Sequence, residues 1–464
     1  MATRIEKDSL GELQVPEEAY YGIQTARAVH NFPISGLRAH PEFIRAVALI
    51  KAAAAITNRE LGYLDEEKSR IIQQVALDVA AGIFNNDMVV DVFQAGAGTS
   101  FHMNVNEVIA NRACELLGGR KGDHHLVSPN DHVNMGQSTN DVIPTAIRLA
   151  ALALTLPLLS ALERLQDALE KKSREFGPII KSGRTHLQDA VPVRLGQEFG
   201  GYARAIEKAK SHLAQSIRSL EELGIGGSAT GTGVNTHPDY RGLIVMHLSK
   251  LAGMNLRTAE NLFEAMQSMA PFTDLSASLR NLAVELIRIA NDLRLLASGP
   301  NTGFNEIQLP AVQPGSSIMP GKVNPVLPEM LNMVCFHVIG NDTCIMMASQ
   351  AGQLELNVMM PVIAYNLLQS LTILTSALDA FRGKCVEGIS ANKEICERYA
   401  EQTLALATVL NPYIGYLAAA EVAKESLKTG KSIKEIVRER KLLGDEEFDK
   451  VFDPVNLTEP RRIK

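Results

Sequence analysis

The chain has 464 residues, of which 46 % are apolar and 21 % are charged, the usual balance of a globular protein. A net charge of −6 is small for this length and argues against a surface for nucleic acid or acidic membranes. Aromatic residues make up 5 % and tryptophan is absent, which also argues against stacking platforms for nucleic acid.

The beginning of the chain is polar and has no apolar run typical of a secretory signal. The five cysteines are odd in number and include no C-x-x-C pair, so we expect reduced thiols in a cytoplasmic protein. The most apolar segment, 149–159, contains Pro157 and is shorter than a bilayer-spanning helix, so we expect no membrane partner.

Hydrophobic periodicity predicts a helical protein with three domains: an irregular N-terminal domain (1–138), a central helical-bundle domain (139–391) and a small C-terminal helical domain (392–464). Leucines at three- and four-residue steps predict long central helices. The helices predicted in chain order span 41–61, 65–84, 105–117, 145–176, 193–223, 272–297, 325–351, 362–386, 394–409, 416–429 and 432–441.

Several of the long helices have apolar residues on more than one face, as in the segments 335–340 and 345–348. Helices of this kind are typical of bundles in which copies of a chain pack together. We therefore expect self-association.

Four polar clusters interrupt the helices, and all are rich in Ser, Thr, Asn, Gln, Gly and His but poor in carboxylates. Hydroxyls, amides and backbone N–H groups at helix starts bind carboxylates without an excess of buried positive charge. The clusters span 94–100, 134–141, 182–189 and 313–325.

Each cluster also has a structural explanation when it is taken alone. The segment 138–141 before a long helix is typical of an N-cap, and His186 is compatible with a helix-start histidine. The glycines at 96 and 98 lack the third glycine of a dinucleotide motif, and the glycine-rich segment 226–233 lacks the lysine of a phosphate loop.

A metal is not expected. His124 and His125 are adjacent in sequence, and adjacent residues seldom bind one ion.

The segment 313–325 is harder to explain by capping, because three prolines and two glycines surround Ser316, Ser317, Lys322 and Asn324. A serine becomes basic only when donors, positive charge or a helix dipole stabilise its alkoxide. Lys322 and the following helix start supply such groups, and we expect this loop to hold an anionic substrate and remove a proton.

The sequence GSSIMPGKVNP at 315–325 resembles the signature of the fumarase/aspartase superfamily. Further ordered matches cover essentially the whole chain and leave chance a negligible explanation. They are YYGIQTAR (20–27), GAGTS (96–100), GQSTND (136–141), GRTHLQDAVP (183–192), GTGVNT (231–236), ANDLRLLASGP (290–300) and AGQLELNV (351–358).

Within the superfamily the chain most resembles the aspartases, because Val326-Leu-Pro-Glu329 follows the KVNP element where fumarases typically have Thr-Gln-Cys-Glu. Three residues depart from the family pattern: Gly136 where serine is frequent, Met333 where glutamine is common, and Met360 before Pro361 where glutamate is usual. The last two leave substrate preference open.

The resemblance implies an all-α fold, a homotetramer whose central helices form one multi-helix core, and active sites built from loops of three chains. It implies no cofactor. It implies reversible deamination of L-aspartate to fumarate and ammonia, with fumarate hydratase as the alternative enzyme and a catalytically silent structural oligomer as a remote one.

The resemblance also implies roles for residues at matching positions. Ser316 matches the base, and Thr99, Ser138, Thr139 and Ser317 match the groups that hold the carboxylate on which charge develops. Lys322 and Asn324 match the groups for the α-carboxylate, Asn140 and His186 those around the ammonium, with Thr185 as a further substrate-binding residue and Glu329 supporting the histidine.

Overall fold

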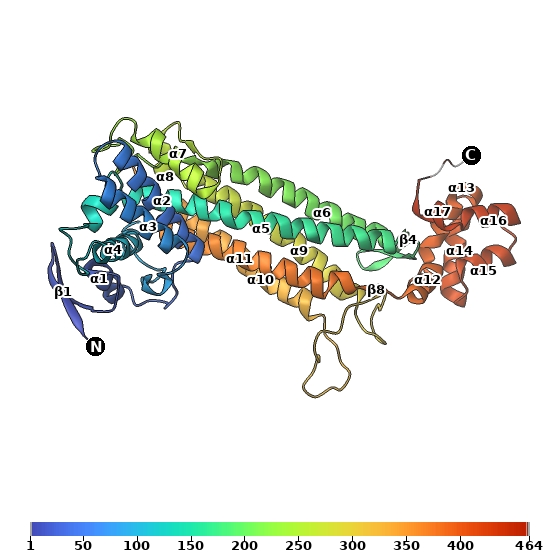
Figure 1. Ribbon diagram of the computed structural model, residues 1–464. Helices are drawn as coiled ribbons and strands as arrows, with labels where there is room; N and C mark the ends of the chain where they lie inside the picture. The colour runs from blue at the N-terminus through green and yellow to red at the C-terminus, as the bar shows by residue number, and fades with distance from the viewer. Residues whose placement is uncertain (1, 461, 463–464) are drawn as a thin grey trace. The chain divides into compact units, whose positions relative to one another are not determined.

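The computed structural model describes residues 2–460 and 462 and divides into two compact units. Unit 1 contains 1–160, 209–283 and 334–375, and unit 2 contains 161–208, 284–333 and 376–464. Five long helices contribute one part to each unit, which is why both units are discontinuous in sequence (Figure 1). These helices are α5 (Thr139–Glu175), α6 (Leu195–Ser216), α9 (Ala270–Leu296), α10 (Val326–Ser349) and α11 (Met360–Lys384).

The all-α prediction is confirmed, since strands occur only in small two-stranded sheets among the described residues. The predicted long helices exist, with ends displaced by a few residues. The prediction of three consecutive domains stays a prediction, because the two units group the chain by contacts and not by sequence order.

Unit 1 begins with an antiparallel hairpin of β1 (Thr3–Asp8) and β2 (Gly11–Pro16), followed by α1 (Ile23–Asn31). Sequence analysis missed all three elements. The unit continues with α2 (Pro41–Glu60), α3 (Glu66–Ala80), α4 (Thr99–Leu116), a π-helical turn (Pro129–Val133), α7 (Tyr240–Ala252) and α8 (Leu262–Gln267).

Helix α2 is the centre of this part of unit 1, because it packs against α3, α4 and α7. Its side chains from Ala46 to Ala55 are buried without interruption, as expected of a helix surrounded by others. One of them is Lys51, whose side chain is completely buried.

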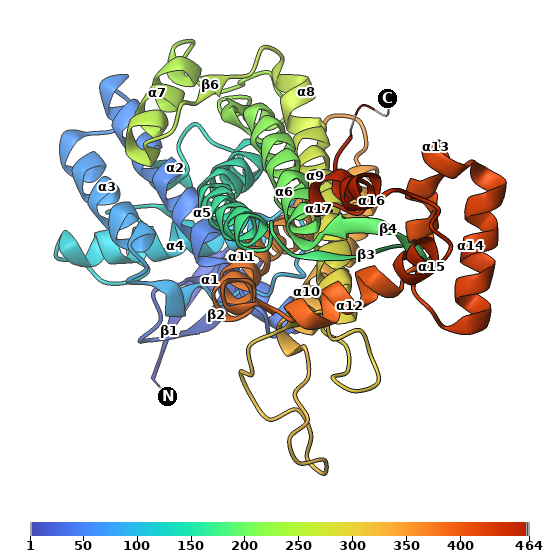
Figure 2. The same cartoon turned by 90° about the vertical axis from the view of Figure 1, so that its right-hand side faces the viewer.

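Unit 2 contains the hairpin of β3 (Ile180–Thr185) and β4 (Gln188–Arg194) and a group of short C-terminal helices (Figure 2). Leu406, Ile436, Phe448 and other apolar residues form a separate core among those helices. The helices are α12 (Lys393–Gln402), a 3₁₀ helix (Leu404–Leu410), α13 (Asn411–Ile414), α14 (Tyr416–Thr429), α15 (Ile433–Glu439), α16 (Asp445–Val451) and α17 (Pro454–Thr458).

The expectation about membrane length is wrong for the helix that contains 149–159. Helix α5 continues through Pro144 and Pro157 and, with α10 and the segment 360–388, is long and apolar enough to cross a membrane by length and composition. In α5, 72 % of the most apolar stretch is buried inside the protein, whereas in α10 only 39 % is buried.

The part of α10 in unit 1 has apolar side chains on its exposed face and two polar side chains on its otherwise apolar buried face. Its buried face carries Asn341 and Asp342, which bond to α11 and α9 through Ser370, Ser276 and Arg280. Its exposed face carries apolar residues at helical spacing: Phe336 (58 % exposed), Met346 (53 %) and Met347 (55 %). Exposure of several large apolar side chains to water is unfavourable, so we expect another protein surface to cover this face of α10.

Candidate active site

Helices α4 and α5 begin next to each other in unit 1. Gly98 precedes α4 with a φ of 98°, and a Cβ at this position would lie 3.0 Å from Ile143 of α5. Only glycine permits both the left-handed backbone and the close approach. The hydroxyl oxygens of Thr99 and Thr139, the first residues of the two helices, are consequently 3.1 Å apart.

Ser138 and Asn140 complete this group. The hydroxyl of Ser138 accepts a hydrogen bond from the backbone N–H of Asn140 at 3.2 Å, and the amide of Asn140 donates to the carbonyl of Ala229 at 2.7 Å. The structure therefore brings together the four unit 1 residues predicted from the sequence: Thr99, Ser138, Thr139 and Asn140. Two helix N-termini with four short polar side chains form an environment suited to a carboxylate.

Asp141 fixes the backbone around this group. Its completely buried carboxylate accepts hydrogen bonds from the backbone N–H groups of Ser138, Gly226 and Ser228. Burial raises the pKa of Asp141 to about 6. The glycine-rich segment 226–233 is thus tied to the start of α5.

Gly136 is explained by the same region. Its φ is 71°, and a Cβ would lie 3.1 Å from the ring of Tyr240. A serine at this position would have a strained backbone and a side chain too close to the ring of Tyr240.

In unit 2, the turn between β3 and β4 carries Thr185 and His186 on an exposed tip. His186 and Leu187 have φ values of 56° and 57°, as in a type I′ hairpin turn. The helix-start explanation for His186 is therefore wrong. The hairpin is anchored by Arg184, which donates to both carboxylate oxygens of the buried Glu306 at 2.9 Å.

The predicted loop 313–325 lies in unit 2 as an irregular segment before α10 (Figure 1). Its neck is closed by the backbone N–H of Gly315, which donates to the carbonyl of Lys322 at 2.8 Å, and by the amide of Asn324, which donates to the carbonyl of Gly315 at 2.5 Å. A Cβ on Gly315 would lie 2.5 Å from the Lys322 carbonyl oxygen, so this closure requires glycine.

Within the loop, the hydroxyl oxygen of Ser316 accepts backbone hydrogen bonds from Ile318 at 3.2 Å and Met319 at 3.0 Å. Two N–H donors aimed at one hydroxyl oxygen stabilise it as an alkoxide. Sequence analysis expected donors near Ser316, and the structure identifies two of them as backbone groups of its own loop.

Lys322, Asn324 and Glu329 line one open cavity of about 630 Å³ together with Arg294. Glu329 lies 3.8 Å from the guanidinium of Arg294 and is not paired with a histidine there. Within the part of the chain that the structure describes, no hydrogen bond joins the His186 turn to the Ser316 loop. The assignment of substrate roles to the residues of unit 2 stays a prediction.

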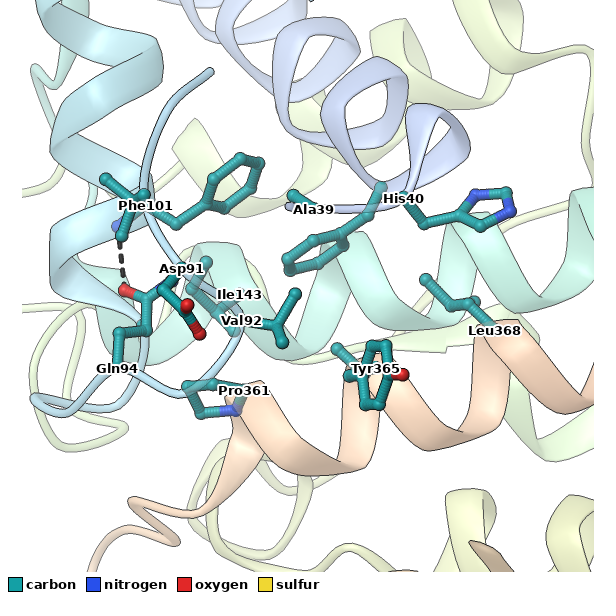
Figure 3. Close-up of a pocket in the computed structure, with 14 residues that line it drawn as sticks. Ala39, His40, Asp91, Val92, Gln94, Phe101, Ile143, Pro361, Tyr365 and Leu368 are labelled. Carbon is teal, nitrogen blue, oxygen red and sulfur yellow. Dashed lines mark hydrogen bonds between the residues drawn. The ribbon is translucent and has the colours of Figure 1, made fainter. Parts of the chain in front are cut away.

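A separate small cavity of about 30 Å³ lies beside the segment 94–98 in unit 1 (Figure 3). Apolar side chains such as Ile143 and Leu368 surround it, and Gln94 turns its amide oxygen to the backbone N–H of Phe101 at 2.8 Å. Its lining contains none of the predicted site residues. This cavity is therefore not part of the candidate site.

Lys51 and His102 contact the candidate site, and sequence analysis missed both. Lys51 bonds to His102, whose other ring nitrogen lies 2.8 Å from the hydroxyl of Thr139. The available signal was a single lysine within the apolar run 46–55. Complete burial lowers the pKa of both Lys51 and His102 well below their ordinary values.

Comparison with known proteins identifies the family of the chain. Residues 11–340 match a family model described as lyase, and residues 406–459 match one described as fumarase C C-terminus. The chain is 48 % identical over 457 residues to aspartate ammonia-lyase of Bacillus subtilis (strain 168), covering 98 % of this chain and 96 % of that protein.

Two further proteins are as similar. Fumarate hydratase class II of Halobacterium salinarum is 50 % identical over 456 residues, covering 98 % of this chain and 97 % of that protein. The crystal structure of fumarate lyase:delta crystallin from Brucella melitensis bound to cobalt has a TM-score of 0.96 at 48 % identity, covering 99 % of this chain and 100 % of that one. The chain therefore belongs to the lyase family, within the fumarase/aspartase superfamily.

Proposed function

We propose that this protein is an aspartate ammonia-lyase, a carbon–nitrogen lyase that interconverts L-aspartate with fumarate and ammonia. The observation that carries the proposal is the environment of Ser316, whose hydroxyl oxygen receives two backbone N–H donors in a loop with Lys322. The 48 % identity to aspartate ammonia-lyase of Bacillus subtilis supports aspartate as the substrate.

In this mechanism the Ser316 alkoxide takes the proton from the carbon beside the β-carboxylate. The electron pair of that C–H bond moves onto the carboxylate and forms a dianionic aci-carboxylate. The pair then returns to form the double bond of fumarate, while the C–N bond breaks and its electrons leave with ammonia. The two backbone N–H groups that donate to Ser316 lower the free energy needed to form its alkoxide.

The unit 1 group would hold the β-carboxylate during this step. Hydroxyls of Thr99, Ser138 and Thr139 lie at the starts of α4 and α5, where the helix dipoles favour negative charge. Donors of this kind act more strongly on the dianion than on the substrate, which is what accelerates the reaction. Ser317 would add a donor from the loop.

Lys322 and Asn324 would bind the α-carboxylate. One N–H of the Asn324 amide holds the neck of the loop, and its second N–H stays available for a substrate oxygen. Asn140, Thr185 and His186 would surround the amino group. Ammonia leaves directly from an ammonium, so His186 need only position it, with Glu329 in support.

Fumarate hydratase is the second candidate because the Halobacterium salinarum enzyme of that name is 50 % identical to the chain. That reaction expels hydroxide, which requires protonation by a general acid. His186 is the only residue assigned near the leaving group that has this capacity.

The proposal includes a homotetramer with sites built from several copies. The exposed apolar face of α10 around Phe336 supports an assembly that covers it. The exposure of Thr185, His186 and Lys322 supports sites completed by other copies. We place the enzyme in the cytoplasm, which the free, mostly buried cysteines support, and assign it no cofactor.

The substrate is tested by following fumarate absorbance with aspartate or malate offered separately. Aspartate should yield fumarate with stoichiometric ammonia, and malate should yield at least about 100-fold less. Turnover of malate alone would instead identify a fumarate hydratase, and an intact oligomer without either activity would revive the structural alternative.

Ser316→Ala removes the proposed base. Turnover of aspartate should fall by about 10³-fold, because general-base catalysis contributes about 10²- to 10⁴-fold. The neighbouring Ser317→Ala removes a donor to the β-carboxylate but keeps the base, so it should lower turnover by less than Ser316→Ala. Near-normal turnover in Ser316→Ala, with the oligomer unchanged by light scattering, would remove serine from the base role.

Phe336→Asp places a charge on the exposed face of α10. If copies pack on this face, the variant should shift from tetramer to smaller species at micromolar concentration, since burial of an unpaired charge costs several kcal/mol. Leu427→Asp is the matched control on α14, where Leu427 is 74 % exposed. A tetramer unaffected by Phe336→Asp in light scattering would locate the subunit interface elsewhere.

A further inference from the structure

The side chain of Lys51 is completely buried, and its amino group bonds to one imidazole and two amides but to no carboxylate. Its amino group lies 2.5 Å from Nε2 of His102, 2.8 Å from Oε1 of Gln137 and 3.1 Å from Oδ1 of Asn134. Burial of a lysine without a directly bonded counter-ion costs free energy, and the buried Asp141 carboxylate nearby offsets only part of that cost. A residue of this kind is therefore expected to have a function beyond packing.

The side-chain amides of Gln137 and Asn134 direct their oxygens at Lys51 because their nitrogens donate hydrogen bonds to backbone carbonyls. Nε2 of Gln137 donates to the carbonyls of Val133 and Met135, and Nδ2 of Asn134 donates to the carbonyl of Gln137. Lys51 thus meets two fixed acceptors and one imidazole nitrogen. An ammonium has three N–H donors, which match these three acceptors.

If Lys51 is an ammonium with these three acceptors, the direction of the hydrogen bond between His102 and Thr139 follows. If Nε2 of His102 accepts from Lys51, the ring proton is on Nδ1 and is donated to the Thr139 hydroxyl at 2.8 Å. Burial lowers the pKa of both Lys51 and His102, which disfavours a state in which both are charged. The three acceptors around the amino group of Lys51 favour the ammonium as the charged member of the pair.

Thr139 then has its own proton available for the site. When the Thr99 hydroxyl gives its single proton to the carbonyl of Gly96 at 2.7 Å and Nδ1 of His102 carries the ring proton, Thr139 donates in the 3.1 Å contact between the two hydroxyls. A carboxylate oxygen is a stronger acceptor than a hydroxyl, so a bound substrate would take that proton in place of Thr99.

We propose that Lys51 and His102 form a buried positioning relay that directs the Thr139 hydroxyl at the substrate β-carboxylate and applies a positive charge to the aci-carboxylate. No proton is transferred along the relay; each donor polarises the next. The inference rests on the proposed deamination, because the relay should favour the dianion over the ground-state carboxylate.

The opposite polarity is the competing arrangement. If Lys51 is a neutral amine, Nε2–H of His102 donates to it and Nδ1 accepts the proton of Thr139. Thr139 would then have no proton for a carboxylate, and Lys51 would serve only to fill the core.

The relay is tested by the affinity of the tetramer for two ligands, measured by calorimetry. Succinate represents the ground-state dicarboxylate, whereas the deprotonated form of 3-nitropropionate has a planar C=N group with a formal negative charge on each of its two oxygens, as the aci-carboxylate has on its C=C group. Lys51→Met should weaken nitronate binding and reduce kcat by about 10- to 100-fold, somewhat less than loss of a direct oxyanion donor. Succinate binding should change by less than about threefold.

His102 supplies a second pair of variants should Lys51→Met fail to fold. His102→Leu removes the donor to Thr139 and should reproduce the selective loss of nitronate affinity. His102→Asn retains an amide N–H near the Nδ1 position and should restore most of that affinity. Lys172→Met, which removes a buried lysine of unit 2, is the control and should leave the ratio of the two affinities unchanged.

A double-mutant cycle with Thr139→Val tests whether Lys51 acts through Thr139. In the Thr139→Val background, Lys51→Met should cause little further loss of nitronate affinity, because the hydroxyl that it directs is absent. An equal loss in both backgrounds, or an unchanged ratio of nitronate to succinate affinity in both Lys51→Met and His102→Leu, would overturn the relay.

These outcomes are separate from failure of the proposed function. If the unmodified enzyme does not deaminate aspartate, the proposed function fails, yet the ligand affinities still test the relay. If the enzyme deaminates aspartate but the nitronate preference does not depend on Lys51 or His102, only the relay fails.

Discussion

The close approach of α4 and α5 at their N-termini is the contact on which the candidate site depends. Gly98 permits it, because a side chain there would crowd Ile143 and would have to adopt a left-handed backbone conformation. The approach brings the hydroxyls of Thr99 and Thr139 within 3.1 Å and aims two helix dipoles at one place. The Asp141 carboxylate then holds the glycine-rich segment 226–233 at the start of α5 through the backbone N–H groups of Gly226 and Ser228. The polarity of the unit 1 group thus comes mainly from dipoles and hydroxyls, and the buried side chain of Lys51 is linked to it through His102.

A second constraint concerns the surface of the single chain. The buried face of α10 is partly polar and its exposed face is apolar, and the groups predicted to act on substrate in unit 2 are largely exposed. The proposed assembly of copies of the chain would cover both kinds of surface. The loop 313–325 is ordered within the single chain, since Gly315 and Asn324 close its neck and backbone N–H groups of the loop bond to Ser316.

Helical periodicity predicted the long helices well, because leucine and alanine recur along their buried faces; the helix 416–429 was predicted to the residue. Helical periodicity did not predict the short elements. The β1–β2 and β3–β4 hairpins alternate weakly, and the glycines before Thr99 concealed the true start of α4. The polar clusters were recognisable from composition and family motifs, whereas the contacts between Lys51, His102 and Thr139 join residues far apart in sequence. Such contacts depend on tertiary packing, which local pattern does not encode.

The central claim is that the hydroxyl group of unit 1 and the Ser316 loop act on the same substrate from different copies of the chain. It is tested most directly by mixing two inactive tetramers, Thr139→Val and Ser316→Ala, through unfolding and refolding. If the two groups come from different chains, random assembly restores both to about a quarter of the sites, so activity should return to about a quarter of the unmodified level. Mixed tetramers that form without any recovery of activity would contradict the account.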